Sequence, residues 1–181
     1  MIIKTLLVSS SAVALSAGYA FADASAWQGF RVGAGIGTNS LADDGVNEES
    51  ETGSTFFIGY DHAFQNFIVG LELSRDNFGG YIDTGLAELN DMLQAKLRVG
   101  YPLDFGLVYG FVGRTEVEDE DEAFDGDGIS YGIGFEYSVN DNLFVGIEAS
   151  KSKTDTVISG KKNSIEELGR KNVALRVGYK F

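Results

Sequence analysis

Apolar and polar residues alternate along most of the chain, which predicts extended strands with two different faces. The segment NVALRVGYKF, at the end of the printed sequence, places five apolar side chains on one face: Val173, Leu175, Val177, Tyr179 and Phe181. The same alternation recurs in seven earlier segments: residues 27–39, 54–64, 67–77, 91–101, 106–115, 129–139 and 143–153. Together with the last segment, starting near Gly169, these predict eight β-strands.

The segment 106–115 alternates less cleanly than the others. Its apolar face is assigned to Leu107, Tyr109 and Phe111, and its polar face to Gly110 and Arg114. Two valines interrupt this polar face, so the assignment of the two faces rests on the other residues of the segment.

The connections between the predicted strands alternate in length. Short connections cover residues 63–66, 102–105 and 140–142, and long connections cover residues 40–53, 78–90, 116–128 and 154–168. This alternation predicts an up-and-down antiparallel meander with one tight end and one loop-rich end. An even number of strands, with both termini at the tight end, allows the last strand to pair with the first.

The polar faces of the strands carry nearly balanced charge, with five positive and four negative side chains: Arg31, Asp61, Glu72, Lys96, Arg98, Arg114, Glu136, Glu148 and Arg176. Glycines lie between them and leave room for long side chains from the opposite wall. Because the interior of an eight-stranded barrel is just wide enough to be filled by side chains, these charges are predicted to form a network in the lumen. The apolar faces then contact lipid, and a closed barrel satisfies the backbone there.

A soluble barrel is the alternative, with charge facing water and apolar side chains around a ligand cavity. Eight strands are too narrow for so many large apolar residues, so the membrane barrel is favoured. Aromatic residues near the tight end also suggest an interfacial girdle: Trp27, Tyr60, Phe64, Phe67, Tyr101, Phe105, Tyr137, Tyr179 and Phe181.

Residues 1–22 have the features of a secretory signal peptide, with Lys4 near the start, an apolar stretch and an Ala-Phe-Ala cleavage site. Residues 23–181 are then the barrel domain. The chain has no cysteine, which excludes a disulfide framework and thiolate metal sites. Its formal net charge of -13 argues against nucleic acid as a partner.

The exported leader, the eight amphipathic segments and the ending V-x-L-x-V-x-Y-x-F resemble the small eight-stranded outer-membrane barrels of Gram-negative bacteria. These are the OmpA-like transmembrane domain and the opacity-type outer membrane protein beta-barrel families. The resemblance covers the mature chain and implies an all-β, antiparallel transmembrane β-barrel in the cell outer membrane, with short periplasmic turns and long extracellular loops. It also implies that Val177, Tyr179 and Phe181 form the signal read by the barrel-assembly machinery.

Four basic residues fall on the lipid-facing register at strand ends next to the long connections: Arg75, Lys151, Lys153 and Lys171. Long basic side chains can extend to the membrane interface, where lipopolysaccharide phosphates lie. We therefore expect a small basic patch, across the seventh and eighth strands, that contacts lipopolysaccharide.

Two long connections are strongly acidic, and one could attract divalent cations through weak candidate ligands: Asp119, Asp121, Asp125 and Asp127. Their spacing does not match a calcium-binding loop, so a solvated acidic loop is favoured over a specific metal site.

The sequence gives no basis for an enzyme or a cofactor. The only histidine, His62, lies at a tight turn, away from the outer leaflet where lipid chemistry would occur. The expected role is that of a structural outer-membrane barrel with acidic exposed loops. A weak porin-like channel for small solutes and a surface adhesin acting through the loops are the alternatives.

Overall fold

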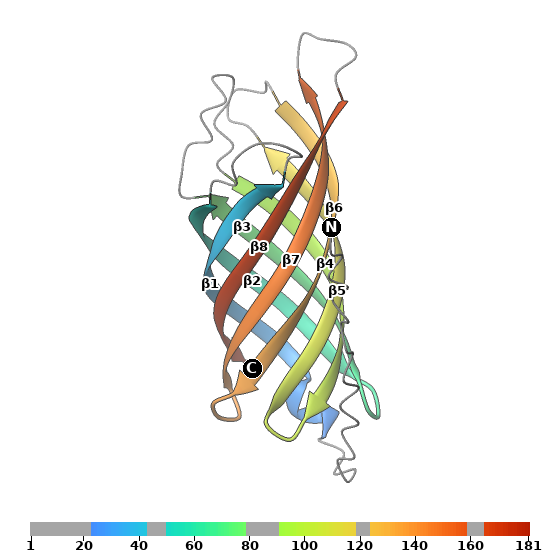
Figure 1. Cartoon of the computed structure of the whole chain (residues 1–181). Helices are drawn as coiled ribbons and strands as arrows, with labels where there is room; N and C mark the ends of the chain where they lie inside the picture. Colours follow the sequence, from blue (N-terminus) through green and yellow to red (C-terminus); the bar gives the residue numbers. More distant parts are fainter. Residues whose placement is uncertain (1–22, 43–49, 79–90, 119–123, 159–164) are drawn as a thin grey trace, which may run out of the picture.

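The computed structural model describes residues 23–42, 50–78, 91–118, 124–158 and 165–181. These residues form one short 3-10 helix, η1, and eight strands that close into a barrel (Figure 1). The elements are η1 (Ala24–Trp27), β1 (Gly29–Ala42), β2 (Ser50–Ala63), β3 (Ile68–Phe78), β4 (Asp91–Leu103), β5 (Gly106–Glu118), β6 (Phe124–Ser138), β7 (Leu143–Ile158) and β8 (Ile165–Lys180). In this part of the chain, no helix has the length and apolar character needed to cross a membrane.

Every strand pairs antiparallel with its sequence neighbours, and β8 pairs with β1 to close the barrel. The backbone N–H of Phe181 donates to the carbonyl of Phe30 at 2.9 Å, which extends this closing pair to the last residue. Closure leaves no open sheet edge, as a strand structure in lipid requires. The eight-stranded antiparallel barrel predicted from the sequence is therefore confirmed.

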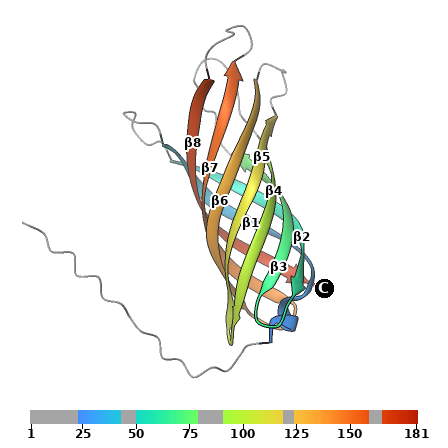
Figure 2. The same cartoon turned by 90° about the vertical axis from the view of Figure 1, so that its right-hand side faces the viewer.

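The turn end of the barrel lies where short segments join β2 to β3, β4 to β5 and β6 to β7, and the opposite end is the loop end (Figures 1 and 2). The strands extend further toward the loop end than the sequence indicated: β2 begins at Ser50, β6 begins at Phe124 and β7 continues to Ile158. The predicted connections were too long because an antiparallel ladder is held by backbone pairing, which continues through polar residues after the apolar alternation ends.

The apolar side chains of the alternating segments point away from the barrel axis and are exposed. Ile133 is 68% exposed and Leu175 61%. In contrast, eight of the nine residues predicted to form the lumen charge network are buried: Arg31, Asp61, Glu72, Lys96, Arg98, Glu136, Glu148 and Arg176. The barrel therefore has a charged interior and an apolar exterior, as expected for a barrel in lipid.

Strand β5 has the opposite register from the one predicted, and Arg114 does not belong to the lumen network. Arg114 is exposed on the outer face, whereas Leu107, Tyr109 and Phe111 are buried inside. The alternation was misread because β5 is apolar on both faces where it passes the turn end of the lumen. The valine at position 112 is 56% exposed and occupies the lipid-facing register.

A buried apolar cluster, which we call the plug, lies in the lumen and reaches the turn end. Its members are Ala24, Trp27, Phe57, Ile68, Leu107, Tyr109, Phe111 and Phe144. Helix η1 places Trp27 inside the barrel, where its ring lies 6.4 Å from that of Phe144. Trp27 is only 5% exposed, so its assignment to the aromatic girdle was wrong. The other residues of that predicted girdle are exposed near the turn end: Tyr60, Phe64, Phe67, Tyr101, Phe105, Tyr137, Tyr179 and Phe181. Trp27 differs because the chain turns inward before β1 begins.

Candidate functional site in the barrel lumen

Eight of the buried charged side chains come from seven of the eight strands and form one connected set of ion pairs inside the lumen. Four are positive (Arg31, Lys96, Arg98 and Arg176) and four are negative (Asp61, Glu72, Glu136 and Glu148). We call these eight residues the lumen network. With Arg114 on the outside, the charges of the network balance, which is the arrangement that burial in a low dielectric requires.

Glu72 of β3 is the centre of the lumen network, because its carboxylate contacts all four cations. Its Oε2 lies 2.8 Å from Nη2 of Arg176 and 3.7 Å from Nη1 of Arg98, and it also pairs with Nη2 of Arg31. Its Oε1 lies 3.3 Å from Nζ of Lys96. One carboxylate thus joins side chains from β1, β4 and β8 across the barrel axis.

Glu136 and Asp61 complete one side of the network. Arg98 donates two parallel hydrogen bonds to Glu136, Nη1 to Oε1 and Nη2 to Oε2, each 3.0 Å long. Arg31 donates to the same Oε1 at 2.8 Å. Asp61 lies 3.5 Å from the Nε atoms of both arginines. Bidentate pairing of this kind fixes the positions of both guanidinium groups.

Glu148 and Tyr109 complete the other side. Lys96 donates to Oε1 of Glu148 at 2.8 Å, and Arg176 pairs with Oε2. The hydroxyl of Tyr109 donates to Oε2 of Glu148 at 2.7 Å and accepts from Arg176 at 3.0 Å. The sequence interpretation missed Tyr109 because it placed this residue on the outer face of β5.

Aromatic rings of the plug contact the network cations directly. The guanidinium of Arg176 lies 3.8 Å from the ring centroid of Phe57, and that of Arg98 lies 4.0 Å from the centroid of Tyr109. Nearer the turn end, Nζ of Lys180 lies 4.2 Å from the ring centroid of Trp27 and donates to the carbonyl of Ala26 at 2.7 Å. Cation–π contacts thus connect the charged side chains to the apolar plug inside the lumen.

A second polar layer lies nearer the loop end, and the sequence interpretation did not include it. Nη2 of Arg170 donates to Oδ1 of Asn39 at 2.6 Å, and Arg170 lies 3.8 Å from Asp76. Asp76 also accepts hydrogen bonds from Thr55, at 2.7 Å, and from Gln94. These residues occupy the same inward-facing, alternate positions of their strands as the network residues. The period-two pattern of the sequence therefore predicts that they lie in the lumen.

Three buried hydroxyl groups lie beside the second polar layer, where Ser74 and Thr115 are the cross-strand partners of Gln94. The buried oxygens of Ser74, Thr115 and Ser130 form no hydrogen bond with any residue that the structure describes. Buried polar atoms of this kind are normally satisfied by ordered water. The upper lumen therefore has the chemistry of a hydrated compartment, whereas the lower lumen has that of a closed core.

The four basic residues predicted to meet lipopolysaccharide are all exposed on the outer face. Lys151 and Lys153 lie on β7 and Lys171 on β8, so these three form one group. Arg75 lies on β3, which the strand order places on the opposite wall of the barrel. The structure therefore brings together three of the four residues.

Val177, Tyr179 and Phe181, the predicted assembly signal, also face outward at the turn end of β8 and are exposed. The two aromatic rings of this set lie 5.0 Å apart in an edge-to-face arrangement. Their side chains are thus accessible on the lipid-facing surface.

The acidic candidate metal ligands lie at the border of the described residues. Asp119 and Asp121 fall outside them, and Asp125 and Asp127 belong to β6 with side chains that the structure does not describe. Within the described ranges, no cluster of three or more acidic or histidine side chains could hold a metal ion. The predicted signal peptide, residues 1–22, also falls outside the described residues.

A closed eight-stranded barrel with an apolar exterior and a buried, charged interior defines an integral outer-membrane β-barrel. The chain belongs to the outer membrane protein beta-barrel domain family, whose model matches residues 5–181.

Two solved structures share this fold at low sequence identity. Neisserial surface protein A (NspA) is 13% identical, with a TM-score of 0.55 over 84% of this chain and 97% of its own. Ail, the attachment invasion locus protein of Yersinia pestis, is 15% identical, with a TM-score of 0.50 over 85% of this chain and 99% of its own. A search of curated protein sequences gave no match.

Proposed function

We propose that this protein is a structural outer-membrane barrel that does not conduct and that presents its loop end at the cell surface. One observation carries the proposal: the charge-balanced lumen network and the apolar plug contact each other and together fill this part of the lumen. A conducting pore would need a continuous aqueous path past both sets of side chains. Export by residues 1–22 and insertion through the terminal residues of β8 belong to the same proposal.

Electrostatic pairing supports a permanent block. Glu72 and Glu136 each contact at least two cations, and the guanidinium groups lie on aromatic rings. Moving any one side chain aside would leave a buried partner without its counter-ion, which costs several kcal/mol. Opening therefore requires the concerted rearrangement of several groups.

Single-channel recording in planar bilayers tests this proposal. We expect no conductance steps from the refolded wild-type protein. As a positive control, Trp27→Ala combined with Glu136→Ser removes the largest plug side chain and the bidentate partner of Arg98, and this variant should produce small steps. Regular steps from the wild-type protein would contradict a non-conducting barrel.

A weak channel for small solutes is the second candidate, and the hydroxyl groups of the upper lumen favour it. Water held by Ser74, Thr115 and Ser130 would bring a solute path down to the lumen network, so that only the network and the plug would need to rearrange. Wild-type steps that disappear when Phe144→Trp enlarges the plug would support this candidate instead.

An enzymatic role is not part of the proposal. The imidazole of His62 lies 4.9 Å from the ring of Phe64 and is exposed near the turn end. A histidine at this position could not activate a nucleophile near the loop end of the barrel. His62 is better explained as an interfacial residue.

A further inference from the structure

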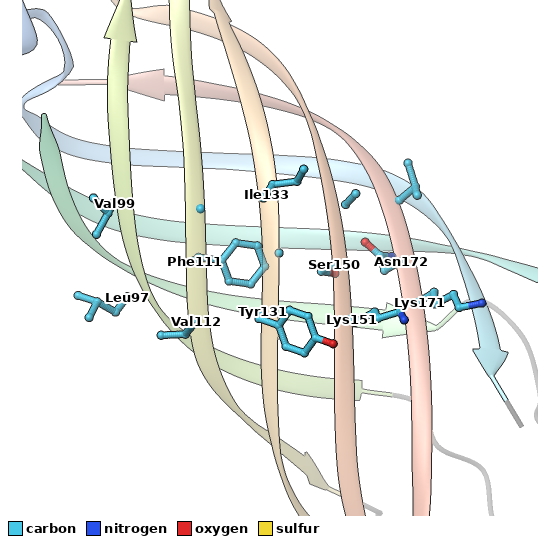
Figure 3. Close-up of a pocket in the computed structure, with 14 residues that line it drawn as sticks. Leu97, Val99, Phe111, Val112, Tyr131, Ile133, Ser150, Lys151, Lys171 and Asn172 are labelled. Atoms are coloured by element: carbon cyan, nitrogen blue, oxygen red, sulfur yellow. The ribbon is translucent and has the colours of Figure 1, made fainter. Parts of the chain in front are cut away.

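A groove on the outer wall of the barrel has the shape and chemistry of a lipid site. It has a volume of about 720 Å³ and crosses the lipid-facing surface of β4 to β8 (Figure 3). Two rows of outward-facing residues, paired across neighbouring strands, form it. The row nearer the turn end contains Val99, Gly110, Ile133, Ala149 and Val173, and the row nearer the loop end contains Leu97, Val112, Tyr131, Lys151 and Lys171.

The groove exists because small residues interrupt a row of large ones. Gly110 and Ala149 flank Ile133 in direct register, so the surface is hollow on both sides of that side chain. A Cβ added to Gly110 would meet no atom closer than 3.8 Å. Most other glycines in the described strands face close neighbours, so the open space at Gly110 belongs to the outer surface rather than to backbone packing. Its lining is apolar and suits an acyl chain.

Two lysines lie at the loop-end edge of the same groove. Lys151 and Lys171 are direct cross-strand partners in the β7–β8 ladder, and both side chains are exposed. Figure 3 shows them continuing the row that begins with Leu97 and passes through Tyr131. Two basic side chains side by side at the edge of an apolar groove match the chemistry of an anionic headgroup attached to acyl chains.

The lysines lie at the height where an anionic headgroup would be. From Tyr179, at the turn end of β8, to Lys171 the strand rises about 20 Å, at ~3.3 Å per residue and ~40° tilt. The apolar band of an outer-membrane barrel is about 25 Å tall and is bordered by aromatic residues. With Tyr179 at the inner border, Lys171 and Lys151 lie close to the outer border.

The corrected register of β5 adds positive charge to this region. Arg114 faces outward in register with Ile129 of β6, which in turn is the partner of Lys153 on β7. This row lies one step above the row of Lys151 and Lys171. Basic side chains therefore border the groove on its loop-end side, while only apolar side chains border it on the turn-end side.

We propose that this groove binds one phosphorylated acyl glycolipid of the outer leaflet, of the lipid A type. An acyl chain lies over Gly110 and Ala149, and a phosphate accepts hydrogen bonds from Lys151 and Lys171. The site rests on the proposed function only in that the barrel must lie in the outer membrane. It does not depend on whether the lumen conducts.

Native mass spectrometry of the refolded, detergent-solubilised full chain tests the site. The probes are purified diphosphoryl lipid A, dephosphorylated lipid A, phosphatidylglycerol and inorganic phosphate. We expect one retained lipid A molecule, with weaker retention of the dephosphorylated form and of phosphatidylglycerol, and no retention of phosphate alone. Equal retention of phosphorylated and dephosphorylated lipid A, or of phosphatidylglycerol, would overturn the proposal.

Two kinds of variant separate the headgroup from the acyl chain. Lys151→Gln with Lys171→Gln should weaken lipid A binding by about thirtyfold, because each basic side chain near a lipid surface contributes roughly an order of magnitude or less. Gly110→Phe should fill the hollow and reduce binding while leaving the charges in place. Unchanged binding by either variant would contradict the proposed site.

Matched changes on the opposite wall control for general effects. Arg75→Gln removes a lipid-facing positive charge from β3, and Ile58→Phe adds an aromatic ring to the outer face of β2. Both controls should bind lipid A as the wild type does. Heat-modifiable gel migration of every variant establishes that the barrel is folded, so loss of binding is distinguished from loss of the outer-membrane barrel itself.

Discussion

Leu175 and Arg176 are neighbours in β8, yet one side chain is 61% exposed toward lipid and the other is buried in the lumen. The contribution of Leu175 to stability requires only that the surroundings of its side chain are apolar. Arg176 depends on particular partners, since it contacts Glu72, Glu148 and Tyr109. Outer-face positions should therefore respond to depth in the bilayer, and inner-face positions to the loss of a specific partner.

The largest effect is expected from Glu72→Gln on the inner face. The change preserves shape but removes the carboxylate that Arg31, Lys96 and Arg176 share, leaving buried positive charge uncompensated. We expect a loss of about 3–5 kcal/mol in the free energy of unfolding, the range found when one partner of a buried ion pair is removed. Urea unfolding in lipid vesicles, followed by fluorescence, measures it.

Asp104→Asn, in the exposed turn between β4 and β5, is the matched control and should change stability by less than about 0.5 kcal/mol. If Glu72→Gln is as stable as this control, the lumen network does not hold the inner face together.

A somewhat smaller effect is expected from Leu175→Arg on the outer face. The guanidinium would lie near the bilayer midplane, where arginine on the lipid side of a barrel costs about 2–4 kcal/mol. Val139→Arg, at the exposed turn end, should cost about 0–1 kcal/mol because the charge reaches the interface. The difference between the two unfolding free energies in vesicles is the measurement. Equal costs would mean that Leu175 does not face the hydrocarbon region.

Glycine substitutions compare packing on the two faces. At Gly178 an added Cβ would lie 2.2 Å from Cζ of the fully buried Phe144, so Gly178→Ala should destabilise by about 1–3 kcal/mol. At Gly110 the nearest atom is 3.8 Å away, so Gly110→Ala should be neutral or slightly stabilising. Unfolding midpoints of both variants test this, and a neutral Gly178→Ala would show that the inner face repacks freely.

The smallest effect is expected at η1, where the chain enters the plug. Hydrogen bonds from the side chain and the backbone N–H of Ser25 lower the pKa of Asp23, which caps η1. A lowered pKa means that the cap stabilises η1 above the unfolded-state pKa and is lost as the pH falls through the folded-state value. We expect acid to shift Trp27 emission to longer wavelength, and Asp23→Ala to show that shift already at neutral pH.

An acid-induced shift of the same size in wild type and Asp23→Ala would mean that Asp23 does not hold the plug in place.

The fold was largely predictable from the sequence because a membrane barrel repeats one rule along every strand. Period-two alternation placed Leu97, Ile133 and Leu175 outside and Arg98 and Glu136 inside, as the structure has them. The rule failed where the lumen stops being polar. In β5 both faces are apolar at the turn end, so alternation alone could not tell inside from outside.

The short turn between β4 and β5 contains the information about the register of β5 that the alternation lacks. Asp104 and Phe105 alone separate β4 from β5, and Leu103 pairs with Gly106. Such a two-residue connection fixes the register, and it makes Phe111 the partner of the inward-facing Arg98. The network contacts themselves were not predictable, because they join strands across the barrel axis at angles that depend on the shear of the whole barrel.

Fluorescence quenching by lipids with brominated acyl chains tests the sidedness of the strands most directly. The chain has a single tryptophan, Trp27, which the structure places inside the plug. In vesicles of such lipids, Leu175→Trp in a Trp27→Phe background should be quenched strongly, and native Trp27 only weakly. Strong quenching of Trp27 together with weak quenching of the Leu175→Trp variant would contradict the account.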